Sequence, residues 1–89
     1  MLPDPNNRRA EERFSLEGEL LLSFDDPMHH EVRAQLVDYS KSGFRAVHEY
    51  AALATGQVVR FQRLVAGGRA RVVWNRILGA QVETGFVVL

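Results

Sequence analysis

The sequence lacks cysteine, and it contains a single lysine, Lys41, among its 11 cationic side chains. Without cysteine, the chain has no disulfide framework, thiolate metal site or cysteine nucleophile. It also lacks any apolar run as long as a membrane span. Residues 1–7 contain neither the basic patch nor the apolar stretch of a signal peptide. These absences predict a soluble cytoplasmic protein.

Net charge of one sign is also missing, because the formal charge at neutral pH is +0. A binder that recognises any polyanion by counterion release is therefore not expected. The ten cations other than Lys41 are all arginine, and the planar arginine fork binds guanine edges and phosphates. At 89 residues, the chain is one domain, of a size at which a closed sheet or small bundle just supplies a core.

Apolar residues that alternate with polar ones predict strands through most of the chain. A long strand is expected from Phe14 to Phe24, and Pro27 breaks the pattern because it cannot donate to a sheet ladder. The alternation of apolar and polar residues resumes after Pro27, leads into Asp38 and continues beyond Gly43. Its core-facing members there are expected to be Val32, Ala34, Leu36, Phe44, Ala46 and His48. Residues 48–55 are predicted to be a loop with at most one turn of helix.

The second half predicts a hairpin with Gly67-Gly68 as its two-residue loop. That register sets Phe61 opposite Trp74 on the core face, and it leaves Arg60, Arg69 and Arg71 on the outer face. Residues 57–76 contain five arginines and no acid. This outer face is either simply solvated or binds phosphate. The last strand lies within residues 78–89, where Gly79 and Gly85 leave its register open.

The three histidines offer little for metal binding or catalysis. His29 and His30 are adjacent, so on a strand their side chains point apart, and no further histidine cluster completes a metal shell. His48 has no serine or carboxylate at a spacing that indicates a nucleophile. The sequence therefore predicts no metal site, no cofactor and no enzymatic activity.

Two short motifs carry the remaining chemistry. Arg9 and Arg13 lie four residues apart, so their forks can converge on one ligand, although Glu11 and Glu12 offer them ordinary solvent-exposed partners. The second motif, Asp38-x-Ser40-x-x-Gly43, combines an acceptor, a hydroxyl and a permissive backbone. Taken alone, it also describes an ordinary hairpin turn.

Together, and in this order along an all-β chain, the two motifs resemble those of the PilZ domain family. The resemblance covers residue 7 to the C-terminus and implies an all-β fold, a six-stranded antiparallel β-barrel. Residues 1–7 are expected to form a flexible tail, because they contain two prolines and two asparagines. The resemblance also implies that residues 8–89 form a receptor for the bacterial second messenger cyclic di-GMP, whose binding orders the N-terminal segment and alters contacts with an unidentified downstream protein. The implied ligand-binding residues are Arg8, Arg9, Arg13, Asp38, Ser40 and Gly43.

These residue types suit that ligand chemically. Arginine can fork onto guanine O6 and N7 or onto a phosphate, and an aspartate accepts hydrogen bonds from the N1 and N2 edge that adenine lacks. By the resemblance, Arg8 accompanies a stacked pair of ligand molecules. Two alternatives remain: a protein-interaction adaptor of the same fold that binds no nucleotide, and a single-strand nucleic-acid binder with Tyr39 and Tyr50 beside the arginine face.

Overall fold

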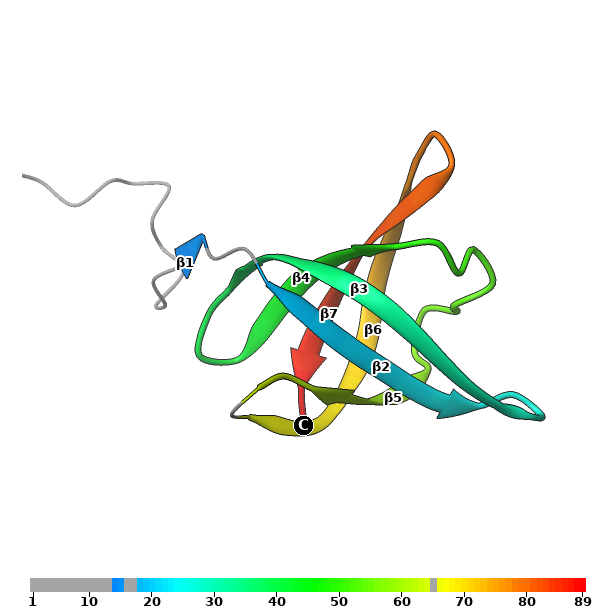
Figure 1. Cartoon of the computed structure of the whole chain (residues 1–89), viewed down its shortest axis with the longest axis horizontal. Coiled ribbons are helices and arrows are strands. Elements are labelled where there is room, and N and C mark those ends of the chain that lie inside the picture. The colour runs from blue at the N-terminus through cyan, green and yellow to red at the C-terminus, as the bar shows by residue number, and fades with distance from the viewer. Residues whose placement is uncertain (1–13, 16–17, 65) are drawn as a thin grey trace, which may run out of the picture.

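The computed structural model describes residues 14–15, 18–64 and 66–89, and these residues form strands, turns and loops without a helix (Figure 1). The strands are β1 (Phe14–Ser15), β2 (Glu19–Asp25), β3 (His29–Tyr39), β4 (Gly43–His48), β5 (Val58–Gln62), β6 (Gly67–Leu78) and β7 (Gln81–Val88). Within these segments, no helix is long and apolar enough to cross a membrane.

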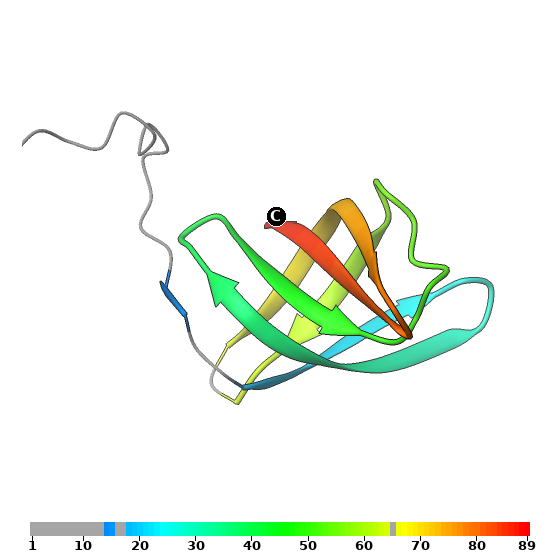
Figure 2. The ribbon, with the colours of Figure 1, turned by 90° about the horizontal axis from the view of Figure 1, so that it is seen from above.

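Strands β2 to β7 form a closed antiparallel barrel. Neighbours follow the order β3-β2-β5-β6-β7-β4, and β4 pairs back onto β3 to close the sheet. Figure 2 shows the strands wrapping around a common interior. Closure gives each of these strands a paired neighbour on both sides, which protects backbone groups that an open sheet would leave exposed at its edges. The predicted six-stranded antiparallel β-barrel is thus confirmed.

The barrel interior is built from the alternating apolar residues. Leu20, Leu22 and Phe24 of β2 are buried, as their period of two predicted. They pack with Ala34, Leu36, Phe44, Ala46, Leu53, Val59, Ala70, Val72 and Phe86. The single strand predicted from Phe14 to Phe24 is wrong, however, because β1 ends at Ser15 and β2 begins at Glu19.

The predicted register of the β5–β6 hairpin is also wrong. Gly67 and Gly68 lie within β6, where they pair with Gln62 and Phe61, and the connection occupies residues 63–66. Val59 therefore faces Ala70, six residues before its predicted partner Arg76. Close packing at Gly67 accompanies this register, because an added Cβ there would lie 3.1 Å from the Phe61 carbonyl oxygen.

Trp74 does not anchor the core as predicted. A bulge between Val72 and Trp74 interrupts the pairing of β6 with β7, so both Val73 and Trp74 are partly exposed. Beyond the bulge, β6 and β7 continue as a hairpin that projects from the barrel (Figure 1). Its turn contains Gly79, which has a positive φ of 62°. These pairings also settle the register of the last strand.

Candidate functional site

A bulge in β3 places Asp38 on the outer surface of the barrel. Leu36 pairs with Ala46 in the interior, but the register shifts by one residue before Asp38, which pairs with Arg45. Simple alternation from Leu36 would have turned Asp38 into the core. Because of the extra residue, Val37, the carboxylate instead shares the outer face with Arg45.

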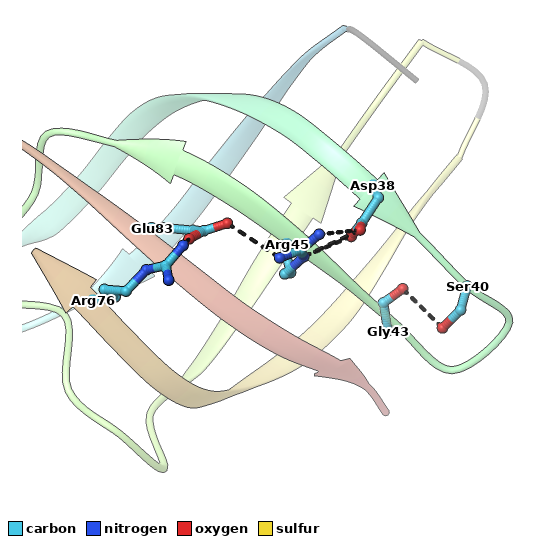
Figure 3. A network of polar contacts seen from close by, with 6 residues as sticks. All are labelled: Asp38, Ser40, Gly43, Arg45, Arg76 and Glu83. Atoms are coloured by element: carbon cyan, nitrogen blue, oxygen red, sulfur yellow. Dashed lines mark hydrogen bonds and ion pairs between the residues drawn. The ribbon is translucent and has the colours of Figure 1, made fainter. Parts of the chain in front are cut away.

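Arg45 holds the Asp38 carboxylate with a two-pronged contact (Figure 3). Its Nε donates to Oδ1 at 3.0 Å and to Oδ2 at 3.1 Å, and its Nη2 also donates to Oδ2. The Asp38 side chain is only 9% exposed, whereas that of Arg45 is 36% exposed. The hydrogen bonds that Arg45 donates to Asp38 raise the pKa of Arg45, so the guanidinium stays charged with one flank open to solvent.

Glu83 of β7 extends this pair into a row of alternating charges. Its buried carboxylate contacts Arg45 Nη1 at 3.5 Å and also binds Arg76, which lies directly opposite on β6. Figure 3 shows Arg45 between the two acids. The four side chains come from four adjacent strands, β3, β4, β7 and β6. Such a network fixes the position of Arg45 more firmly than one exposed ion pair would.

Ser40 and Gly43 flank the tight turn that joins β3 to β4. The backbone N–H of Ser40 donates to the Gly43 carbonyl at 2.7 Å, and the Ser40 hydroxyl approaches the same oxygen at 3.5 Å. A side chain at Gly43 would meet the Phe86 carbonyl oxygen at 2.4 Å. Glycine is therefore required for β4 to pack against β7, whether or not a ligand binds nearby.

A cavity of 120 Å³ lies beside this turn and is lined by Ser40, Gly43, Tyr39 and Phe61, among others. A ligand pocket for a drug-sized molecule typically measures about 300–1,000 Å³. A nucleotide would therefore have to bind across the outer surface and not inside this end of the barrel.

Trp74 continues the outer surface from Arg45 across β7. Arg45 and Trp74 both pair with Gly85, one from each side, so Asp38, Arg45, Gly85 and Trp74 form one row across adjacent strands. At the usual strand spacing, this row spans roughly 14 Å. The indole, 37% exposed, lies over Gly85, where an added Cβ would be 2.3 Å from its Nε1. An aromatic surface thus borders the Asp38–Arg45 pair.

The first motif falls outside the described residues, so the structure places none of Arg8, Arg9 and Arg13. The strand that follows the motif is described. The backbone of β1 pairs Phe14 with Tyr39 and Ser15 with Asp38. The chain therefore passes directly beside the second motif one residue after Arg13.

Arg45 and Trp74 are residues of the candidate site that the sequence analysis did not assign to it. A signal for Arg45 was available, because a hairpin centred on Lys41-Ser42 places residue 45 opposite residue 38. For Trp74 the signal was hidden, since its exposure depends on the bulge at Val73.

The histidines lie away from this row. His29 binds the exposed acids Asp25 and Glu31 at 3.0 and 3.4 Å, and His30 stacks on Phe24. No group of three His, Asp or Glu side chains in the described part of the chain is arranged to hold a metal ion. His48 is the last residue of β4 and is buried, as its core-facing position predicted, and it hydrogen bonds with Thr84 at 2.7 Å.

No protein-family model matches this chain, and no curated protein matches it either. The assignment to the PilZ family stays a prediction, based on the two motifs and consistent with the barrel.

Proposed function

We propose that this chain is a non-enzymatic receptor domain for cyclic di-GMP, belonging to the PilZ family. The observation that carries the proposal is the pairing of β1 with the end of β3. It brings the residues that follow Arg13 to the backbone of Asp38 and Tyr39. Two motifs separated by 24 residues in the sequence can therefore act on one ligand, with Arg9 and Arg13 closing over it.

The Asp38–Arg45 pair matches the hydrogen-bonding groups of guanine. Guanine presents acceptors at O6 and N7 and donors at N1 and N2, whereas adenine has no N2 amino group and carries a donor at position 6. An arginine donates to the first edge, and an aspartate accepts from the second. Since Arg45 already occupies the Asp38 carboxylate, a guanine would share or replace part of this contact. The half-exposed flank of Arg45 makes that exchange possible at the surface.

Trp74 adds a planar surface to the same row. Exposed aromatic rings bind bases by stacking, which contributes about 1–3 kcal/mol per base. In this proposal, one guanine is read by Asp38 and Arg45, and the Trp74 indole supports a neighbouring base. Ser40, which directly follows β3 and lies two residues after Asp38, adds a hydroxyl.

Of the two alternatives, the single-strand nucleic-acid binder has the weaker support. It required Tyr39 and Tyr50 to flank the arginine face, but both rings pack against the core cluster. The remaining alternative is a protein-interaction adaptor of the same fold that binds no nucleotide. For both the cyclic di-GMP receptor and the adaptor, we expect a downstream partner that is a protein and a location in the bacterial cytoplasm.

Calorimetric titration with cyclic di-GMP, cyclic di-AMP and a short single-stranded RNA tests the proposal. We expect binding of cyclic di-GMP, with the diadenosine analogue at least about tenfold weaker because an unpaired polar edge is costly in a site built for guanine. Asp38→Asn should narrow this difference, and Arg33→Gln, on the outer face of β3, serves as the control. Absence of heat with cyclic di-GMP would favour the adaptor, and preference for RNA would favour the nucleic-acid binder.

A further inference from the structure

Among the residues that the structure describes, three arginines on one side of the barrel have no acidic partner, unlike other arginines. In residues 18–64 and 66–89, Arg33, Arg45 and Arg76 each pair with a carboxylate, and Arg63 lies over the Tyr39 ring. The structure gives no ion pair or side-chain hydrogen bond within those segments to Arg60, Arg69 or Arg71. All three are exposed.

Two of these arginines face each other directly. Arg60 of β5 pairs with Arg69 of β6. The hydrogen bonds from Val72 N to Gln57 O and from Arg63 N to Ala66 O fix the alternation along this ladder. They put the Arg60–Arg69 pair at a non-hydrogen-bonded position, where opposite side chains lie closest. Like charges at such a position destabilise a sheet.

The pair stands at the rim of a groove of 420 Å³ on the outside of β2, β5 and β6. Ser23 and Gln62 contribute polar side chains, and Gly67 and Gly68 leave the backbone uncovered. Its lining includes no acid and none of the four residues in the row from Asp38 to Trp74. The groove is therefore cationic and separate from the site described above.

We propose that this groove is a second binding site, which takes the phosphate group of a phosphate ester between Arg60 and Arg69. A phosphate has enough oxygens to accept from both guanidinium forks, and its charge relieves their mutual repulsion. Ser23 and Gln62 can donate to the remaining oxygens. The groove volume suits a ligand the size of a nucleotide or a lipid headgroup. The proposal does not depend on cyclic di-GMP binding at the other site.

Thermal unfolding at low ionic strength, with pyrophosphate as the probe, tests this site. The variants are Arg60→Gln and Arg69→Gln, and the matched control is Arg71→Gln, which removes the same charge from the same strand face but does not line the groove. Pyrophosphate should raise the midpoint of the wild type by about 5 °C at saturation. Sodium chloride at the same ionic strength should give a much smaller increase.

The melting midpoints of Arg60→Gln and Arg69→Gln should be higher than that of the wild type without pyrophosphate and should respond less to its addition. Without pyrophosphate, each should melt about 3 °C higher because the opposed charges are gone. With pyrophosphate, each should lose most of the increase and bind at least about tenfold more weakly by calorimetry. Arg71→Gln should keep most of the wild-type response.

A second arm distinguishes a soluble ester from a lipid headgroup. Co-sedimentation uses phosphatidylcholine vesicles with and without phosphatidylglycerol. Binding that needs phosphatidylglycerol, Arg60 and Arg69 identifies a headgroup, and binding to pyrophosphate alone identifies a soluble compound that carries phosphate. The site is refuted if neither probe binds, if sodium chloride reproduces the effect, or if the groove variants respond like Arg71→Gln.

Discussion

The indole of Trp74 occupies the space that a side chain at Gly85 would fill. An ideal Cβ on Gly85 would lie 2.3 Å from both Cε2 and Nε1 of the indole, closer than any van der Waals contact allows. The two residues are paired across β6 and β7, so the ring covers a stretch of β7 backbone that glycine leaves bare. This contact sets the position of the aromatic surface beside Arg45.

Gly85→Ala should therefore displace the indole and destabilise the barrel by about 1–3 kcal/mol, the usual cost of overpacking. In a Trp74→Ala background, the same change should be neutral or stabilising, because alanine is less costly than glycine in a strand. Urea unfolding of the four proteins gives the coupling energy, and tryptophan fluorescence reports the ring displacement. Additive effects would show that the two residues do not interact.

Trp74→Ala alone should cost about 2 kcal/mol through lost apolar contact, less than the roughly 3–5 kcal/mol typical of a fully buried aromatic residue. The ring is 37% exposed, and water can fill the space it leaves. If the ring also stacks on a guanine, the folded variant should bind cyclic di-GMP about tenfold more weakly. Equal affinity in calorimetry would remove Trp74 from the proposed site, without bearing on Asp38.

The sequence predicted the core better than the surface, because alternation reports which face is buried only while a strand stays regular. Leu20, Leu22 and Phe24 follow the rule and are buried. Val37 and Val73 break it as bulges. Both are ordinary strand residues, so nothing local marks them. Their effect is to place Asp38 and Trp74 on the outer face, where the proposed site lies.

The β5–β6 register failed for a different reason. Gly67-Gly68 has the composition of a two-residue turn, but in the folded chain both glycines lie in β6, where an added Cβ on Gly67 would be 3.1 Å from the Phe61 carbonyl oxygen. A glycine needed for close packing cannot be told from one needed for a turn by local sequence alone. The opposed pair Arg60 and Arg69 became visible only with the correct register.

Arg45→Ala should lower the free energy of unfolding by about 1–3 kcal/mol. The change removes the fork from the Asp38 carboxylate, whose side chain is only 9% exposed, and an uncompensated buried charge is costly. The estimate stays below the cost for a fully buried pair, because Arg45 itself is partly exposed. Arg45→Lys should recover only part of the loss, since an ammonium cannot form the two-pronged contact.

Urea unfolding checks this prediction, with Arg33→Ala as the matched control. Arg33 is exposed on the outer face of β3 and lies 3.8 Å from Glu19, so its removal should cost less than about 0.5 kcal/mol. If Arg45→Ala unfolds at the same urea concentration as Arg33→Ala, the ion pairs that Arg45 forms with Asp38 and Glu83 do not stabilise the barrel.

His48 should make the barrel less stable in mild acid. The Tyr50 N–H donates to His48 Nδ1 at 3.1 Å. The ring therefore carries its proton on Nε2, which donates to Thr84, and Thr84 in turn donates to Asn75. Burial lowers the pKa of His48 from its ordinary value of 6.5. A second proton on Nδ1 would face the Tyr50 N–H, so the folded state resists protonation.

Since the pKa of His48 is lower in the folded state, the unfolded chain binds more protons below pH 6.5. The contribution of His48 to the free energy of unfolding should be fully present above that pH. It should decrease as the pH falls toward the pKa of the folded state, by at most about 1.4 kcal/mol per pH unit. His29, whose pKa is raised by Asp25 and Glu31, contributes with the opposite sign. Urea midpoints between pH 5 and 8 check this, and His48→Gln should remove the decline that wild type shows.

Arg13→Ala should lose most of the affinity for cyclic di-GMP, about tenfold or more, and should leave the melting temperature of the ligand-free protein nearly unchanged. Arg13 belongs to a charged segment that precedes the barrel strands, and solvated arginines add little to folding. Calorimetry and thermal unfolding measure the two effects separately, with Arg33→Ala as a control for charge. Undiminished affinity would exclude Arg13 from the site.

The last prediction concerns stoichiometry and depends on Arg8. One cyclic di-GMP has two guanines and two phosphates, and the residues proposed for one molecule already supply three arginine forks, an acceptor and a hydroxyl. A fourth arginine next to them needs a further anionic or planar target, because ordering its long side chain costs up to about 2 kcal/mol. A second ligand stacked into the first provides such a target.

We propose that the second molecule would lie on the row from Asp38 to Trp74, since guanine faces can interleave above the exposed indole. We therefore expect two molecules of cyclic di-GMP per wild-type chain and one per Arg8→Ala chain, with the first site retained. Calorimetry measures the molar ratio, and Arg33→Ala should keep the ratio of two. If Arg8 instead pairs loosely with Glu11 or Glu12, the mutation will leave the ratio unchanged, and a wild-type ratio of one would likewise rule out its proposed role.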